Sequence, residues 1–238
     1  MERPSRRGRK TASALVAYAW AGRVEAEYRS AAQTQELTLW LLQIGASPDL
    51  VRDGLRIVED ELTHAELSRR VWVESGGDTL PVLDRASLGL GRTHDVLELD
   101  VCAAVVRYFC LGETVAVRLF SHLRKSTTVQ VAKRALDRIL EDEVRHRQFG
   151  WTSLEWLLQG PLEAELRAQI DAMLPTWIRA LERAYGDDVE HGIKAVTDEE
   201  RAWGVAPWRE YADILHRTYA TDYRRRFERL AIAFPARA

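Results

Sequence analysis

An eight-residue segment that occurs twice constrains this chain more than any other feature of its sequence. Ile57-Val58-Glu59-Asp60-Glu61-Leu62-Thr63-His64 returns as Ile139-Leu140-Glu141-Asp142-Glu143-Val144-Arg145-His146. Both copies lie in stretches whose apolar residues recur with the period of an α-helix. A Glu and a His three residues apart project from the same face of a helix. The repeat therefore predicts two related helices, each of which presents one Glu and one His on a shared face.

Helical periodicity extends through almost all of the chain, and no stretch alternates with a period of two. Glycine and proline account for only 14 and 7 of the 238 residues, so long uninterrupted elements are expected. The predicted helices are Thr11–Ile44, Pro48–Glu74, Thr93–Arg124, the stretch from the Ser126-Thr127-Thr128 turn to Gln159, Leu162–Tyr185 and Trp208–Ala233. The sequence therefore predicts an all-α protein.

The positions of the helix-breaking and turn-forming residues predict how these helices are organised. Residues 1–10 form a basic N-terminal tail, and Gly160-Pro161 is the clearest break. Between them, residues 11–159 form two antiparallel helical hairpins. A long crossover joins the second helix to the third, which is one of the topologies of four-helix bundles. Residues 160–238 are then expected to form a two-helix extension.

Composition excludes several classes of function. The chain has 34 basic and 36 acidic residues, so it lacks the positive charge expected of a nucleic-acid partner. No apolar run approaches the roughly 18–20 residues of a membrane span, and two cysteines cannot build a disulfide framework. Ser5–Lys10, followed by an apolar stretch, has the outline of a twin-arginine export signal. The helical register continues past Arg23, so a cytoplasmic protein is the first expectation and export the alternative.

The repeated motif falls on predicted core faces. Glu61 and His64 lie on a mostly apolar helical stripe, and Glu143 and His146 lie on another. Glu59, by contrast, shares its face with basic residues and is expected at the surface. A buried carboxylate is costly unless it is paired or binds a metal ion. The motif therefore predicts a metal site inside the bundle.

The two remaining helices of a bundle of this kind each supply one carboxylate. On the third helix, Glu113 lies on an apolar stripe. On the first helix there are three candidates, Glu25, Glu27 and Glu36. Equal distances from the turn favour Glu36, whereas the apolar face favours Glu27. We prefer Glu27, because packed helices can differ by a turn whereas a core face cannot be exchanged for a polar one.

Taken together, these residues resemble the ferritin-like di-iron carboxylate superfamily, whose pattern is Glu, Glu-x-x-His, Glu, Glu-x-x-His on four helices. Leu41–Pro48, Gly112–Ala116 and Glu141–His146 are similar to segments of bacterial ferritin-like domain proteins. The resemblance covers about residues 11–159. The ligand set it implies is Glu27, Glu61, His64, Glu113, Glu143 and His146.

The resemblance also implies cofactors and supporting residues. Two iron ions are expected, with manganese or a mixed manganese–iron pair as alternatives, because carboxylate and imidazole ligands suit these metals. Relatives use an Asp that precedes the ligating Glu to hold the histidine of the opposite helix. Asp60 is thus expected to hold His146, and Asp142 to hold His64.

The reaction expected first is oxidation of a small organic substrate by O2 at a di-iron site. An external electron donor and a homodimer are compatible with this function. The second expectation is an iron- or peroxide-handling protein like bacterioferritin or rubrerythrin. Against it, the extension would obstruct packing into a shell, and the paired Cys-x-x-Cys site of rubrerythrin is absent. A metal-free helical interaction protein is the third, and the intact ligand set argues against it.

Overall fold

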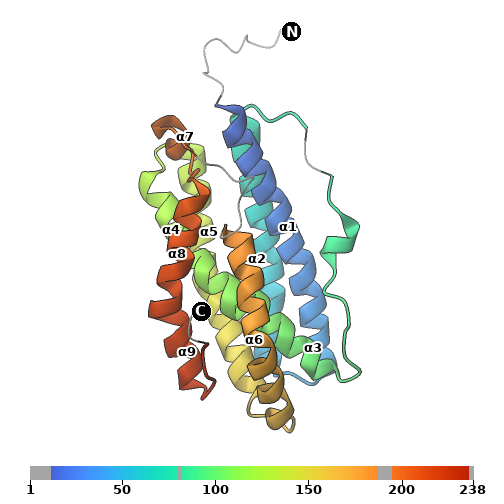
Figure 1. The fold of residues 1–238 in the computed structure, drawn as a ribbon. Coiled ribbons are helices and arrows are strands. Elements are labelled where there is room, and N and C mark those ends of the chain that lie inside the picture. Colours follow the sequence, from blue (N-terminus) through green and yellow to red (C-terminus); the bar gives the residue numbers. More distant parts are fainter. Residues whose placement is uncertain (1–11, 80–81, 187–194, 236–238) are drawn as a thin grey trace, which may run out of the picture.

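Helices make up the architecture throughout the part of the chain that the structure describes. The computed structural model describes residues 12–79, 82–186 and 195–235, and this part contains no strand (Figure 1). The all-α class is therefore confirmed. The expected basic tail at residues 1–10 lies outside the described residues. None of the described helices combines the length and hydropathy that crossing a membrane requires.

The first two long helices form an antiparallel pair. Helix α1 spans Ala14–Gln43 and α2 spans Pro48–Glu74, and the two pack along their length. Gly45 makes the turn between them with φ of +76°, a conformation that side chains with a Cβ atom rarely adopt. Ser47 caps α2 by accepting a hydrogen bond from the backbone N–H of Leu50, and Pro48 occupies the first turn.

A long connection follows α2 and returns along α1 (Figure 1). It contains one turn of 3₁₀ helix, η1, at Arg85–Leu88. Three hydrogen bonds fasten this part of the connection to α1. Arg29 Nε donates to Ser87 Oγ at 3.2 Å, Gln33 Nε2 donates to the carbonyl of Ser87 at 3.0 Å, and Glu36 Oε2 accepts from the N–H of Leu90 at 2.7 Å. The polar face of α1 is thereby used to hold the crossover.

The third helical stretch differs from the sequence prediction. A single helix was expected over Thr93–Arg124, but the structure has α3 at Leu97–Ala104, a π-helical segment η2 at Val105–Glu113, and α4 at Thr114–Ser126. Hydrophobic periodicity cannot predict a π-helix, because the change from i→i−4 to i→i−5 bonding depends on packing as well as on local preference. The segment ends at Glu113, one of the predicted ligands.

Helix α5, Gln130–Leu157, completes this arrangement and contacts α2, α4 and η2. Gly150 of this helix lies directly against η2. A Cβ atom on Gly150 would lie 2.4 Å from Phe109 Cβ and 2.9 Å from the Phe109 carbonyl carbon. A side chain at this position would separate α5 from the π-helical segment, so the two elements depend on this glycine to pack.

The C-terminal part is more segmented than predicted. It comprises α6 at Glu163–Tyr185, the short α7 at Asp198–Ala202, α8 at Trp208–Thr218, the π-helical η3 at Tyr219–Tyr223, and α9 at Arg224–Arg229. The two helices predicted for this part therefore correspond to α6 and to the continuous path from α8 to α9. That path ends at Arg229, not Ala233, and α7 was not predicted.

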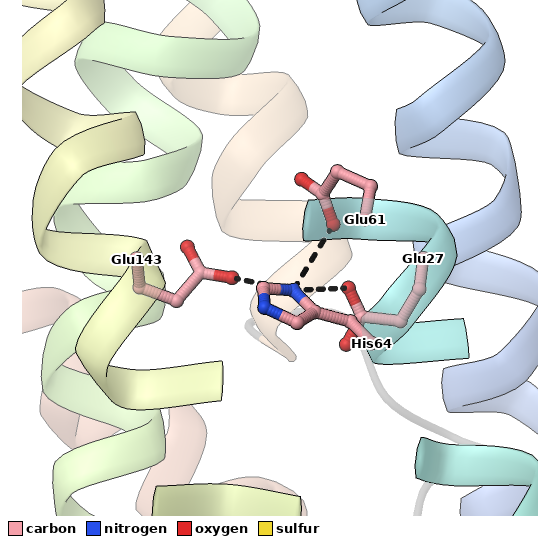
Figure 2. Close-up of side chains that lie close together, drawn as sticks. All are labelled: Glu27, Glu61, His64 and Glu143. Atoms are coloured by element: carbon pink, nitrogen blue, oxygen red, sulfur yellow. Dashed lines mark ion pairs between the residues drawn. The ribbon is translucent and has the colours of Figure 1, made fainter. Parts of the chain in front are cut away.

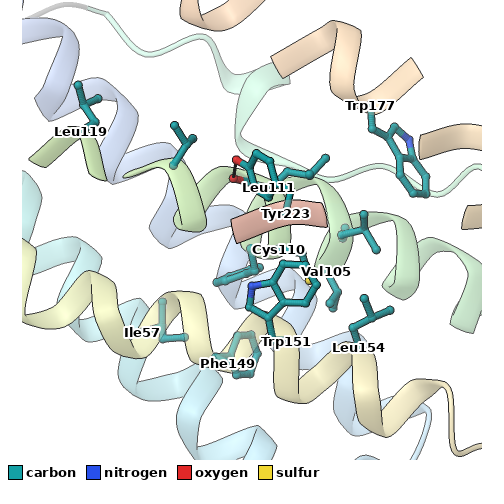
Figure 3. Close-up of a cluster of buried hydrophobic side chains, with 14 of the residues drawn as sticks. Ile57, Val105, Cys110, Leu111, Leu119, Phe149, Trp151, Leu154, Trp177 and Tyr223 are labelled. Atoms are coloured by element: carbon teal, nitrogen blue, oxygen red, sulfur yellow. Dashed lines mark hydrogen bonds between the residues drawn. The ribbon is translucent and has the colours of Figure 1, made fainter. Parts of the chain in front are cut away.

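These C-terminal helices share a hydrophobic core with the rest of the chain. Tyr223 is fully buried, and its hydroxyl donates a hydrogen bond of 2.5 Å to the carbonyl of Leu111 in η2 (Figure 3). The ring of Trp151 on α5 meets that of Phe227 edge to face, 4.9 Å between centroids. Helix α6 packs against α3, and α8 against α4. The domain boundary at residue 160 remains a prediction.

Candidate metal centre

The six residues that the sequence singled out as ligands lie together in the interior. One oxygen or nitrogen of each of Glu27, Glu61, His64 and Glu143 lies within 4.8 Å of the others (Figure 2). A second group, defined in the same way, joins Glu61 to Glu113 and His146. The side chains come from α1, α2, η2 and α5, so each long helical stretch around this interior supplies at least one of them.

Glu61 and Glu143 each lie between the two histidines. The two oxygens of Glu61 are 3.4 Å from His64 Nδ1 and 3.4 Å from His146 Nδ1. Those of Glu143 are 3.9 and 3.8 Å from the same nitrogens. Glu27 is at 3.9 Å from His64 Nδ1. The arrangement thus has two centres, with one histidine at each and two carboxylates shared between them.

An aspartate on the opposite helix faces the far nitrogen of each histidine. His64 Nε2 lies 3.1 Å from Asp142 Oδ2, and His146 Nε2 lies 3.4 Å from Asp60 Oδ2. These are the two pairs that the resemblance implied. Because a carboxylate accepts hydrogen bonds, Nε2 is the donor in both pairs, and Nδ1 is the ring nitrogen that faces the cluster.

Two arginines neutralise these aspartates on the side away from the glutamates. Arg145 donates to Asp60 at 2.8 Å and to Asp142 at 2.7 Å. Arg138 donates to Asp142 at 2.6 Å. The sequence analysis did not single out either arginine, although their spacing from Asp142 on α5 indicates ion pairs along the helix.

Several polar atoms in the cluster are buried without a hydrogen-bond partner among the described residues. They are Glu61 Oε2, His64 Nδ1, Glu143 Oε2 and His146 Nδ1. Buried polar atoms are almost always satisfied, so each unsatisfied one calls for an explanation such as an ion. All four belong to residues that face the two centres, and all four are oxygen or nitrogen atoms of the kinds that bind metal ions.

Burial and mutual repulsion oppose ionisation of three of the glutamates. Burial, with the adjacent charge of Glu61, holds the pKa of Glu27 well above its usual range. Burial and Glu113 do the same for the pKa of Glu143, and burial raises the pKa of Glu113. Carboxylates so placed favour a bound cation, which offsets both the burial and the repulsion.

Three further groups of the cluster have pKa values that are shifted by their neighbours. Burial raises the pKa of Glu61, but the adjacent imidazoles of His146 and His64 outweigh it and hold this pKa below its usual range. Burial lowers the pKa of His146, yet Asp60 and Glu61 raise it to about 10. Burial likewise raises the pKa of Asp60, while His146 and Arg145 lower it to about 2. Clusters of such perturbed groups are typical of functional sites.

The structure separates the three candidates on the first helix. Glu27 is buried within the cluster. Glu25 instead forms an ion pair with Arg29 on the same helix, and Glu36 holds the crossover through Leu90. The apolar-face argument therefore agrees with where these side chains lie, and the turn-distance argument does not. Glu59 is exposed, as expected.

The glutamate side of the cluster opens into a cavity of about 1130 Å³. Glu27, Glu61, Glu113 and Glu143 line it, whereas neither histidine does in the part of the chain that the structure describes. Other lining residues come from the C-terminal part, and the sequence analysis missed their role: Val205, Ala206, Trp208, Tyr211 and Tyr185. Its walls are largely apolar and aromatic, which is typical of sites for small organic ligands.

Comparison with known proteins adds no further constraint. No family model, no curated protein and no solved structure matches this chain. The class of protein must therefore be inferred from the cluster and the cavity themselves.

Proposed function

We propose that this protein is a ferritin-like di-metal carboxylate oxidoreductase, in which a four-helix bundle holds two iron ions and O2 oxidises a small organic substrate. The single observation that carries the proposal is the set of four unsatisfied, buried donor atoms on Glu61, His64, Glu143 and His146. Such atoms are costly in an interior unless a cation occupies the space they face. Manganese has similar ligand preferences and is the alternative metal.

The ligand assignment follows from the two groups of side chains. Glu27 and His64 would hold one ion, Glu113 and His146 would hold the other, and Glu61 and Glu143 would bridge them. When bound, a pair of ferrous ions supplies the electrons with which O2 is reduced. The protein contributes the placement of ligands and the dry surroundings.

The surrounding residues have separate roles in this proposal. Asp60 and Asp142 fix the histidine rings so that Nδ1 faces the centre. Arg138 and Arg145 balance the aspartate charges, which keeps the aspartates as hydrogen-bond acceptors. Ser30 donates to Glu61 Oε1 at 2.8 Å and limits the orientations of that carboxylate.

The cavity favours oxidation of an organic substrate over iron or peroxide handling. A volume of about 1130 Å³ with aromatic walls, next to four glutamates, exceeds what iron or peroxide requires. A bacterioferritin-like or rubrerythrin-like function has no specific use for such walls. An external electron donor and a homodimer remain predictions.

Metal analysis tests the proposal most directly. Purified protein should contain two equivalents of iron or manganese per chain, measured by inductively coupled plasma mass spectrometry. Glu61→Ala and Glu143→Ala should each lose most of the metal, because both carboxylates would bridge the ions. The matched controls Glu59→Ala and Glu141→Ala change exposed residues two positions earlier, and should retain it.

Oxygen reactivity then separates the classes of function. Anaerobic loading with ferrous iron, followed by O2, should give an optical change that is absent in Glu143→Ala. Addition of organic candidates should accelerate O2 consumption. Rapid oxidation of many iron equivalents, unaffected by any organic compound, would support the iron-handling alternative. Absence of bound metal under all loading conditions would contradict both, and leave the metal-free interaction protein.

A further inference from the structure

The cavity beside the glutamates follows helix α1 and contains a positive charge. The α1 residues that line it extend from Tyr18 to Leu37, which corresponds to about 28 Å of helix at 1.5 Å per residue. Glu27 lies near the middle of this stretch. Arg23, one turn earlier, also lines the cavity. The cavity is therefore elongated, with a guanidinium group one helical turn from the candidate metal centre.

The guanidinium of Arg23 is held by two aromatic rings and by the hydroxyl of Tyr211, but it forms no ion pair among the described residues. It lies 4.2 Å from the centroid of the Trp20 ring and 5.6 Å from that of Phe120. These rings contact the faces of the guanidinium plane and leave the N–H groups at its edge for a partner. Nη1 is buried and has no hydrogen-bond partner among the described residues.

A neighbouring arginine of the same helix provides a contrast. Arg29 also lines the cavity, but it forms an ion pair with Glu25 and donates a hydrogen bond to Ser87 Oγ at 3.2 Å. Its charge is satisfied within the protein. Arg23 contacts the neutral hydroxyl of Tyr211, but within the described part of the chain it forms no ion pair and its Nη1 has no acceptor, so a ligand in the cavity is the natural source of a negative partner.

The charge balance of a site that holds two metal ions also favours an anionic partner for Arg23. Two divalent ions would neutralise the four glutamates, and Arg138 and Arg145 already neutralise Asp60 and Asp142. The charge of Arg23 would then have no counterpart. A guanidinium that lines a cavity without an ion-pair partner favours an anionic ligand, because arginine can donate two parallel hydrogen bonds to a carboxylate.

We propose that the cavity binds a small amphipathic carboxylate, with its carboxylate on Arg23 and its apolar body extended along α1 past Glu27 toward Leu37 and Phe109. This inference rests on the proposed function, since it names the class of substrate for that site. Tyr211 lines the cavity beside Arg23 and can donate a second hydrogen bond to the carboxylate. Its hydroxyl stays protonated, because burial raises the pKa of Tyr211 even though the charge of Arg23 opposes that rise.

The walls support this orientation of the ligand. Leu37 and Phe109 are almost completely buried and line the cavity, and Phe109 lies one turn before Glu113. An apolar chain that starts at Arg23 and continues toward them passes the four glutamates. The carbon atoms nearest the candidate metal centre would then be those a few bonds from the carboxylate.

Ligand binding by isothermal titration calorimetry tests the inference independently of turnover. Octanoate, decanoate and dodecanoate should bind wild-type protein of measured metal content, while decanol and decylamine should bind at least about tenfold more weakly. Arg23→Gln should weaken decanoate binding by about tenfold or more, which is the expected loss of one charge-assisted hydrogen bond. Arg23→Lys should recover part of the affinity. Arg29→Gln is the matched control and should bind decanoate like wild type.

The outcomes separate this inference from the proposed function. Unchanged decanoate affinity in Arg23→Gln, or equal affinity for decanol and decanoate, would overturn it even if two metal ions were bound. Conversely, decanoate binding that depends on Arg23 in protein without metal would support the carboxylate site, while the oxidoreductase proposal failed. Thermal unfolding and metal content should be the same for Arg23→Gln and wild type, which shows that the variant remains folded.

Discussion

The candidate metal centre has two halves, one from α1 and α2 and the other from η2 and α5, and they present the same kinds of candidate ligand in different surroundings. In the first half, Glu27 follows Arg23 by four residues and precedes Ser30 by three. In the second half, Glu113 has Phe109 and Ala116 at the corresponding positions. The first half thus supplies a positive charge and a hydroxyl donor beside its glutamate, and the second supplies an aromatic ring and a methyl group.

The backbones of the two halves differ as well. Glu27 lies on a regular α-helix, whereas Glu113 ends the π-helical segment η2. What recurs in both halves is the set of candidate metal ligands, and what differs is the part of each helix that faces the cavity. The repeated motif therefore contains four of the six candidate ligands, while in our proposal the specificity for a ligand depends on residues that the two halves do not share.

The largest expected effect tests whether the two glutamates outside the repeated motif are equivalent. Glu27→Gln and Glu113→Gln should each remove about one of the two metal ions, because each would serve a single ion through a charged oxygen. Metal content per chain, measured by mass spectrometry, checks this. Glu36→Gln is the control: Glu36 lies on the same helix as Glu27, but its carboxylate binds the crossover. Metal loss in Glu36→Gln with retention in Glu27→Gln would reverse the assignment.

A second prediction concerns how tightly each helical pair is packed. Gly54 on α2 faces Thr38 Oγ1, which a Cβ atom would approach to 2.4 Å, whereas Gly150 on α5 faces both the side chain and the backbone of Phe109. A threonine side chain can shift, but the π-helical backbone cannot. Gly150→Ala should therefore lower the free energy of unfolding by about 2–3 kcal/mol, and Gly54→Ala by about 1 kcal/mol or less.

Denaturant unfolding followed by circular dichroism measures both variants. Gly150→Ala should also alter the placement of Glu113, and hence lower metal content, while Gly54→Ala should retain it. Equal effects of the two substitutions on stability would show that η2 adapts as readily as a side chain. The difference between the regular helix of the first half and the π-helical segment of the second would then not affect the free energy of unfolding.

Much of the cluster was predictable from the sequence because helical faces are periodic. The period places Glu61 with His64 and Glu143 with His146, and it favours Glu27 over Glu36. The all-α class follows from the same pattern. These inferences need only the geometry of a single helix and the cost of burying a carboxylate.

The remaining features depend on contacts between helices that are distant in the sequence. The π-helical segment is stabilised where Gly150 lets α5 approach Phe109, and where Tyr223 binds the carbonyl of Leu111. The cavity exists because the C-terminal residues pack over α1 and α4, which places Tyr211 beside Arg23. Hydrophobic periodicity does not indicate which surface each of these helices covers. Neither the π-helical segment nor the cavity could therefore be predicted from it.

The smallest expected effect concerns how the first helix of each half begins. Ser13 precedes α1 without a side-chain capping bond, whereas the segment before α3 is tied to a buried carboxylate. Asp100 accepts hydrogen bonds from the N–H and hydroxyl of Thr93 at 3.1 and 2.7 Å, and from His94. Although burial raises it, these bonds with Thr93 and His94 lower the pKa of Asp100 to about 2.

Because this pKa is lower in the folded state than the ordinary value of 3.8, the ionised Asp100 stabilises the fold above about pH 4. That contribution should fade as the pH falls from about 4 to about 2. Asp100→Asn should lower the free energy of unfolding by about 1–2 kcal/mol at pH 7. The difference between variant and wild type, measured by urea unfolding, should shrink toward zero near pH 2. A difference that stays constant over this range would mean that Asp100 acts through its shape and not its charge, and the two halves would then begin in electrostatically similar ways.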